Sequence, residues 1–220
     1  MKIAIPAQTA LSAFHFVSTE ATRYYLNGIC VEPHKAGGII VTATDGHALL
    51  SIHTPDGETS EKQAIIHLSK AARAALKPNR NDGNLTRYLA IDGDTARIVL
   101  STTPGSPFNE ADPEYRVIGM YPLSGDDICI IDGTFPDWRR VVPTASKKAE
   151  PAHFCFNPAL LVRFQKAFPK AFISVACNDE RGPILIGVNL REESKDTVCG
   201  VIMPARGNIM TERPAFTLSD

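Results

Sequence analysis

Apolar and polar positions alternate along most of the chain, and the order of the patterns repeats three times: one strand, one helix, three more strands. The first copy opens with a strand at residues 1–5, followed by apolar positions spaced as one helix face. That face consists of Ala10, Ala13, Phe14 and Val17. A single unit leaves a helix and a sheet face uncovered, so we expect the units to pair.

The other strands of the first copy are expected at residues 23–33, 37–43 and 47–53. An Asp-Gly pair at residues 45–46 separates the last two strands. Glycine tolerates positive φ and aspartate bonds the nearby backbone, so the pair predicts a hairpin turn. His47 is then expected to begin the next strand.

The second copy begins with a strand at residues 64–68 and a helix that Ser69 caps and Pro78 ends. Its expected apolar face consists of Leu68, Ala71, Ala72 and Ala75. After this helix, strands are expected at 87–91, 95–100, 115–120 and 127–131, with a loop at 104–113.

The third copy is expected to begin with a strand at residues 153–156. Asn157 is the expected helix N-cap, Pro158 the first helical residue and Pro169 the end. The buried side is expected to hold Leu161, Phe164 and Phe168, with Leu160 and Ala167 beside it. The last strands are expected at 172–177, 183–192 and 196–203.

With 220 residues, 44% apolar content, 21% charged residues and a net charge of −1, the chain is typical of a soluble globular protein. No apolar run approaches the roughly 20 residues that span a bilayer, and the N-terminus lacks the apolar region of a signal peptide. We therefore expect a cytoplasmic protein with no membrane partner. A nucleic-acid partner stays open, because local clusters of Lys and Arg decide it.

The five cysteines are widely spaced and include no C-x-x-C pair, which argues against a zinc site and a disulfide framework. Most lie in apolar sequence, where cysteine behaves as a small apolar residue. We expect buried free thiols at Cys30, Cys129, Cys155, Cys177 and Cys199.

Two helices carry basic residues at the same i, i+3, i+7 spacing, which places each set on one helix face. The rows are Lys70, Arg73 and Lys77 in the second copy, and Arg163, Lys166 and Lys170 in the third. Such stripes could contact a DNA backbone without reading its sequence. A solvated helix face explains either row equally well, so both interpretations stay open.

Asp45 and His47 are two residues apart, so on a strand they would point to one side as metal ligands or an acid–base pair. Two ligands are too few for a usual metal site, and a turn Asp beside a strand His is the simpler interpretation. The sequence contains no nucleophile elbow, P-loop or H-E-x-x-H helix. We expect no catalytic set, no metal and no cofactor.

The segment at residues 135–140, Phe-Pro-Asp-Trp-Arg-Arg, holds the only Trp of the chain, a rigid Pro and two Arg. This composition fits a structural corner and an interaction surface equally well.

Four motifs together resemble the bacterial DNA polymerase III β subunit, the sliding clamp. They are Arg23-Tyr-Tyr-Leu-Asn-Gly28, Ala43-Thr-Asp-Gly-His47, Phe135-Pro-Asp-Trp-Arg-Arg-Val141 and Val201-Ile-Met-Pro-Ala-Arg206. The resemblance implies an α+β protein with the DNA clamp (sliding-clamp) fold, built from the repeated strand-helix-three-strand unit. It also implies a protein without catalytic activity.

Residues 1–143 resemble the middle domain of that family, and residues 152–206 resemble the second half of its last domain. A linker is expected at 144–151 and a polar tail at 207–220. The first domain and the first half of the third have no counterpart, and a loop-rich insertion occupies about residues 101–125. The Arg that usually follows the Thr-Asp-Gly-His motif is Ala48 here.

In that family, the four motifs converge on a pocket between the second and third domains, which captures short hydrophobic peptides of replication proteins. Apolar walls with a few polar groups suit such a ligand. The implied pocket residues are Leu26, Thr44, Gly46, His47, Leu49, Pro136, Arg140, Val141, Val201, Met203, Pro204 and Arg206. The resemblance also places the two basic rows near the DNA.

Two functions follow from the resemblance. The first is a minimal processivity factor of DNA replication, from a phage or mobile element, that binds double-stranded DNA non-specifically and captures peptides of polymerase and repair proteins. A family ring resembles twelve units and this chain has three, so four copies would supply the number and we expect a homo-oligomer. The alternative is an adaptor or decoy that binds clamp-interacting peptides without encircling DNA. An enzyme that uses Asp45 and His47 is a third class.

Overall fold

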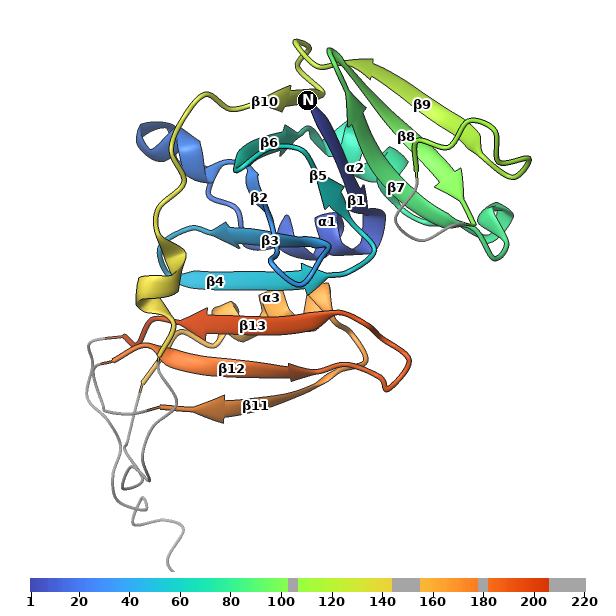
Figure 1. Ribbon diagram of the computed structural model, residues 1–220. Coiled ribbons are helices and arrows are strands. Elements are labelled where there is room, and N and C mark those ends of the chain that lie inside the picture. Colours follow the sequence, from blue (N-terminus) through green and yellow to red (C-terminus); the bar gives the residue numbers. More distant parts are fainter. Residues whose placement is uncertain (103–106, 144–154, 178–181, 206–220) are drawn as a thin grey trace, which may run out of the picture.

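The computed structural model describes residues 1–102, 107–143, 155–177 and 182–205, and confirms the α+β class (Figure 1). The first unit comprises β1 (Lys2–Pro6), α1 (Ala7–Ala13), the 3₁₀ helix η1 (Ala21–Leu26), β2 (Ile29–Pro33), β3 (Ile39–Thr44), β4 (Ala48–Thr54) and the short β5 (Glu58–Thr59). The second comprises β6 (Ala64–Leu68), α2 (Lys70–Leu76), η2 (Arg80–Asp82), β7 (Thr86–Asp92), β8 (Thr95–Ser101), β9 (Arg116–Pro122), β10 (Ile128–Ile130) and η3 (Trp138–Val141). The third comprises α3 (Ala159–Ala167), β11 (Phe172–Ala176), β12 (Ile184–Asn189) and β13 (Thr197–Ile202).

The first two units interlock by exchanging strands. β1 of the first unit pairs with β7 of the second, and β6 of the second pairs with β2 of the first, both antiparallel. The five-stranded sheet has the order β5-β1-β7-β8-β9, and the eight-stranded sheet has the order β10-β6-β2-β3-β4-β13-β12-β11. The third unit therefore extends the larger sheet, with β13 beside β4 and β11 at the edge (Figure 1).

The core is continuous from the first unit to the third. Ala7, Ala10 and Ala13 are buried on α1, and their small side chains let the helix pack on strands of both sheets. Phe16, just after α1, meets Phe164 of α3 edge to face, with 4.8 Å between ring centroids. The third unit thus shares its interior with the first.

The strand expected from residue 23 is wrong in its first half, because β2 begins only at Ile29. Residues 21–26 form η1, and the alternation around Tyr24 does not reflect a strand. Local polar bonds explain the turns: Arg23 donates to the carboxylate of Glu20, while the Asn27 side chain and backbone N–H donate to the carbonyls of Glu20 and Tyr24.

Ser69 caps α2 as expected, since its Oγ accepts from the Ala72 N–H at 3.1 Å. The helix ends at Leu76 because the next residue precedes a proline, which disfavours helical φ/ψ, and Lys77 is extended (φ −64°, ψ 127°). Ala72 and Leu76 are the buried residues of this helix, whereas Ala71 is exposed. Of the predicted face, Leu68 and Ala72 are buried and Ala75 is half-buried, so the prediction was wrong at Ala71 alone.

The third helix begins one residue later than expected, with Pro158 as its N-cap, although the Asn157 carbonyl oxygen Oδ1 still accepts from the Ala159 N–H at 3.0 Å. Its buried face also differs from the expected one, although Phe164 is buried as expected and packs over Gly200 of β13. The buried residues are Leu160, Phe164 and Ala167, whereas Leu161 and Phe168 are half-buried.

The other expected strands are present with ends shifted by a few residues, and the insertion contains β9. β5 and η2 were not expected. The strand at 153–156 is not found at residues 155–156, and its first half lies outside the described residues, as do the linker at 144–151 and the tail at 207–220. In the described part of the chain, no helix is long and apolar enough to cross a membrane.

The cysteine expectation was correct for free thiols and wrong for burial. All five are unpaired, but only Cys30 is fully buried. Burial raises the pKa of the Cys30 thiol, with the nearby Glu32 carboxylate adding to this effect.

Candidate functional site

Four segments that are far apart in sequence enclose a pocket of about 270 Å³. They are η1, the β3–β4 turn, the segment around η3, and the end of β13. Nine of the twelve expected pocket residues line it: Leu26, Thr44, Gly46, His47, Leu49, Pro136, Val141, Val201 and Met203. The pocket lies where the first and third units meet, since its walls come from both sides of the β4–β13 pairing.

The structure does not bring the remaining three expected residues into the pocket lining. Arg140 is exposed on η3, and Pro204 is half-buried just after Met203. Arg206 lies outside the described residues. Five lining residues were missed although each lies within or next to a recognised motif: Arg23, Tyr25, Ala48, Asp137 and Trp138. Only their side-chain directions, which a motif does not give, could have identified them.

The β3–β4 turn is held by its own polar side chains. Asp45 Oδ1 accepts from the backbone N–H of His47 at 2.9 Å and of Ala48 at 3.0 Å. Thr44 Oγ1 accepts from the Gly46 N–H at 3.0 Å and donates to the Ala48 carbonyl at 2.9 Å. Gly46 has φ +90°, which favours glycine. His47 therefore lies in the turn, not in β4 as expected, and its exposed side chain lines the pocket.

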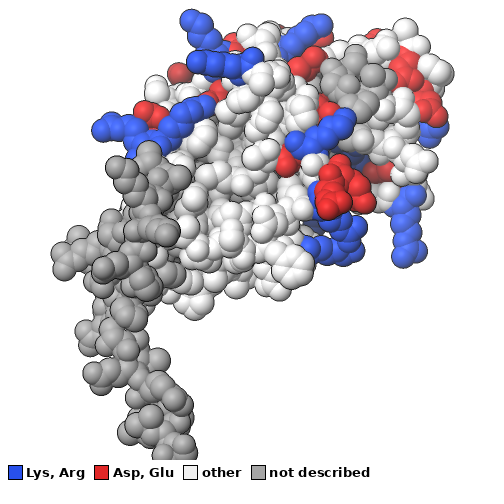
Figure 2. Space-filling view, turned by 60° about the horizontal axis from the view of Figure 1, so that its bottom comes forward, with Lys and Arg blue, Asp and Glu red and all other residues white. Residues whose placement is uncertain are grey.

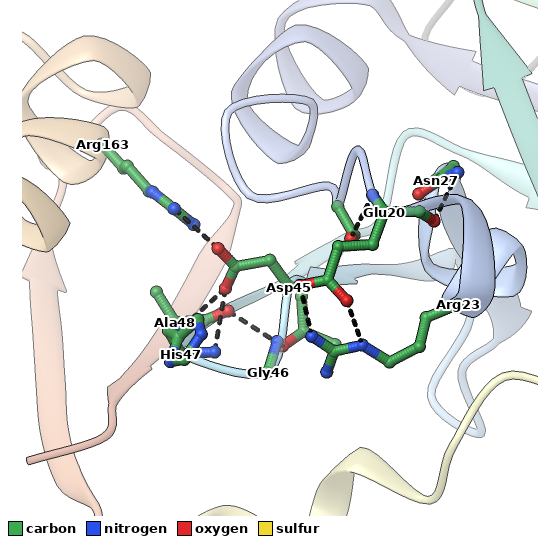
Figure 3. A network of polar contacts seen from close by, with 10 residues as sticks. Glu20, Arg23, Asn27, Asp45, Gly46, His47, Ala48 and Arg163 are labelled. Atoms are coloured by element: carbon green, nitrogen blue, oxygen red, sulfur yellow. Dashed lines mark hydrogen bonds and ion pairs between the residues drawn. The ribbon is translucent and has the colours of Figure 1, made fainter.

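Asp45 also ties the turn to the third unit. Its Oδ2 lies 2.6 Å from the Arg163 guanidinium of α3, so this ion pair crosses the boundary between units (Figure 3). Burial alone would raise the pKa of Asp45, but Arg163 and the N–H groups of Ala48 and His47 hold it below its usual value. The Asp45 carboxylate is therefore ionised, and both of its oxygens already have partners. It holds the backbone of the turn and does not orient the imidazole of His47.

A second polar pair borders the pocket at η1. The Arg23 guanidinium bonds both carboxylate oxygens of Glu20, at 2.9 and 2.7 Å (Figure 3). This pairing lowers the pKa of Glu20 and raises that of Arg23. A Cβ at Gly46 would lie 2.7 Å from Arg23 Nη1, so the guanidinium covers the turn closely.

The end of β13 forms the opposite wall. Its register places Val201 opposite Leu49 of β4, and the Met203 N–H donates to the His47 carbonyl at 2.9 Å. Val201 is buried, whereas the Met203 side chain is 37% exposed. A flexible apolar side chain at the mouth of a pocket can adapt to different partners.

The segment around η3 forms one side of the pocket, and its own packing and polar contacts hold it in place. Phe135 is buried in a small cluster with Leu26 and Cys30. Arg139 pairs with the Glu32 carboxylate and stacks on Trp138, with its guanidinium carbon 4.3 Å from the ring centroid. The same segment thus serves as a structural corner and as a pocket wall.

The two basic rows do not form two helical stripes. Lys77 and Lys170 lie beyond the ends of α2 and α3, and Arg163 is committed to Asp45. Arg73 lies over the Phe14 ring at 5.5 Å, and its Nε donates to the Ser69 carbonyl at 3.3 Å.

Basic residues of both rows nevertheless gather near the end of α1. The pKa of His15 is lowered by partial burial and then by the charges of Lys166, Arg73 and Lys77. Cations from α2 and α3 therefore share one neighbourhood around His15, although the i, i+3, i+7 pattern is broken. No cluster of potential metal ligands occurs among the described residues.

Comparison with known proteins gives a consistent relationship, although no protein-family model matches the chain. The chain is 31% identical over 137 residues to the β sliding clamp of Caulobacter vibrioides, and 26% identical over 150 residues to that of Treponema pallidum. These alignments cover 60% and 68% of this chain but 31% and 33% of the relatives, so the chain spans about a third of their length.

Solved structures extend the likeness to most of the chain. The sliding clamp of Bartonella birtlesii bound to griselimycin matches with a TM-score of 0.61 and 18% identity, covering 94% of this chain and 66% of that one. The clamp of Bacillus subtilis matches with a TM-score of 0.57 and 16% identity, covering 94% and 65%. All of these proteins are sliding clamps, the family that the four motifs resemble. This chain is therefore a homologue of the bacterial β sliding clamp, the DNA polymerase III β subunit, and has the sliding-clamp fold.

Proposed function

We propose that this chain is a sliding-clamp-like processivity factor of DNA replication that captures short peptides of polymerase and repair proteins. The observation that carries the proposal is the convergence of four distant motifs on one pocket. Nine of the twelve residues that the resemblance implied line this one cavity. The likeness to β sliding clamps, including one named as DNA polymerase III subunit β, supports the same function.

The chemistry of the pocket fits an apolar peptide anchor. Leu26, Leu49, Val201 and Met203 supply apolar walls, while His47 and the turn supply polar groups at the rim. The volume of about 270 Å³ is near the lower bound for small-molecule sites, which suits one or two side chains of an extended peptide.

The pocket is tested with a fluorescently labelled clamp-binding peptide from a bacterial polymerase, measured by polarisation. Val141, which is 39% exposed on the pocket wall, offers the variant Val141→Asp, and Val117, 43% exposed on β9, offers the matched control Val117→Asp. We expect Val141→Asp to weaken binding about tenfold or more, because it places a charge in an apolar site.

The control variant should bind like the unmodified chain. If the unmodified chain shows no binding at about 100 μM peptide, the pocket is not a peptide site and the proposal is wrong. Equal losses in the two variants would mean that the effect does not come from the pocket.

Non-specific DNA binding belongs to the same proposal, with several copies needed to surround a duplex. It is supported by the cations that gather near His15 from α2 and α3. Phosphate contacts of this kind weaken steeply as salt rises.

The alternative is an adaptor or decoy that binds clamp-interacting peptides without encircling DNA. The ion pair of Arg163 with Asp45 favours it, because a cation expected to contact DNA instead supports the pocket. An adaptor would bind the peptide but show no salt-dependent affinity for a duplex, so measuring both ligands on one preparation separates the two functions.

A further inference from the structure

The first and second units bury each other's β2 and β7, the strands that follow their helices. In each unit, the strand that follows the helix turns its apolar side chains toward the helices. On β2, Ile29 and Val31 are both 0% exposed, and on β7, Leu89 and Ile91 are 1% and 0% exposed. The strand supplied by the opposite unit, β6 for β2 and β1 for β7, completes this burial.

The third unit has no such cover among the described residues. β11 holds the equivalent position, and its register places Ile173 opposite Val188 and Val175 opposite Ile186, on the buried side of β12. Yet Ile173 is 40% and Val175 is 43% exposed. β11 pairs with β12 alone in the described chain, so its other edge is open.

The helix of the third unit is equally uncovered. A groove of about 250 Å³ runs between α3 and β11, lined by apolar side chains that include Leu161, Phe168 and Ile173. Val162 of α3 is 42% exposed. Figure 2 brings the β11 side of the molecule forward and shows a broad area free of Lys, Arg, Asp and Glu. A large uncharged surface with an open strand edge is typical of an interface.

We infer that the third unit of one copy pairs with the third unit of a second copy. In each copy, the exposed side chains of β11 and α3 would then be buried, as those of the first two units are by their mutual pairing. The occupant must be a unit of the same kind, because the repeat shows that one unit is completed by another. The first and second units already pair with each other and are not available to cover a third unit. The third unit of a second copy is available, because it is uncovered in the same way. Pairing two identical surfaces gives a closed two-fold dimer.

This inference extends the proposed function, which leaves the contact between copies undefined, and it does not rest on the peptide pocket. Two copies would join into three complete two-unit domains, with β9 of each chain at the outer ends. The paired third units would lie at the centre of the assembly.

The test is the mass in solution of the full chain between 1 and 100 μM, measured by light scattering and sedimentation. We expect twice the chain mass of 23.9 kDa. Val175→Asp on β11 and Val162→Asp on α3 should each raise the dimer dissociation constant tenfold or more. Val117→Asp is the matched control, since Val117 and Val175 are both 43% exposed on edge strands.

Hydrogen exchange gives a second measurement that needs no variant. The amides of β11 should exchange more slowly as the concentration of the unmodified chain rises, while those of β9 should not change. A chain that is monomeric at 100 μM would overturn the inference, as would a dimer that persists in both β11-side variants with unchanged circular dichroism. Loss of the dimer in Val117→Asp instead would assign the contact to β9. Peptide binding is measured on the same samples, so failure of the dimer leaves the test of the pocket intact.

Discussion

At the scale of single residues, Asp45 has two roles that the sequence presents as one. Its Oδ1 accepts from the backbone of the β3–β4 turn, and its Oδ2 pairs with Arg163 of α3. The Asp-Gly signal predicts the first role from local chemistry. The second role depends on a partner more than a hundred positions away in the sequence, and no local pattern indicates it.

Replacing Asp45 with Asn should separate the two roles. Asn keeps an acceptor for the N–H groups of His47 and Ala48 but loses the charge that faces Arg163. We expect the free energy of unfolding to fall by about 1 kcal/mol, because the pair is partly shielded from solvent. Chemical denaturation of Asp45→Asn, Arg163→Gln and the double variant measures the coupling. Additive losses would show that the ion pair contributes nothing.

His15 provides a pH-dependent signal at the basic cluster. Its pKa in the folded chain is lowered from 6.5 by partial burial and by Lys166, Arg73 and Lys77. The unfolded chain therefore binds the proton at higher pH, so stability should fall as pH decreases through about 6.5 and below. Thermal unfolding of His15→Gln should show a smaller fall over this window. A slope equal to that of the unmodified chain would contradict the assignment.

At the scale of elements, the packing of α3 on the sheet depends on Gly200 of β13, which has no side chain. A Cβ at Gly200 of β13 would lie 2.3 Å from Phe164 Cε1 and 3.1 Å from Ile186 Cβ. The helix can therefore lie close to the sheet only over a glycine.

Gly200→Ala should lower the free energy of unfolding by about 1–3 kcal/mol, because Phe164 is buried and cannot move aside. Gly187→Ala on β12 is the matched control, since the one close approach of its Cβ would be to the hydroxyl of Ser174, which can rotate away. Denaturant titration compares the two variants. Similar losses in both would show that backbone effects, not the helix contact, dominate.

Sequence patterns predicted the strands well and the helix faces less well. Strand alternation survives small errors of position, so most strands appear near their expected residues. The helices are short, and a face assigned from three or four residues shifts easily, as Ala71 and Leu161 show. η1 was missed because bonds among Glu20, Arg23 and Asn27 outweigh the β propensity of two tyrosines.

The lining of the pocket could be predicted from the resemblance, whereas the two basic rows could not be placed from spacing alone. Pocket residues lie in four motifs whose joint pattern is specific, and nine of them reach the lining. The basic rows rested on helical spacing alone, and that spacing ends where α2 and α3 end. Beyond the end of a helix, the spacing of residues in the sequence does not show which way their side chains point.

At the scale of the whole molecule, cations from two units face the same region near the end of α1. We expect Lys77→Glu and Lys166→Glu together to weaken binding to a random-sequence duplex about tenfold or more at 50 mM salt, and to flatten the dependence of affinity on salt. Lys35→Glu, which reverses an exposed charge in the β2–β3 loop, is the control. Electrophoretic mobility shift or polarisation measures the affinities, and an unchanged slope would leave these lysines as ordinary solvated residues.

The pocket lies across the pairing of β4 with β13, where the first and third units meet within one continuous sheet. One wall belongs to the first unit and the other to the third, and the Asp45–Arg163 pair lies close by. Under the proposed function, a peptide that contacts both walls would bind only while the first and third units stay packed against each other. At a hundred times its dissociation constant, such a ligand would stabilise this packed arrangement by about 2.7 kcal/mol. Occupation of the pocket would then hold the third unit, and β11 with it, in place against the first unit.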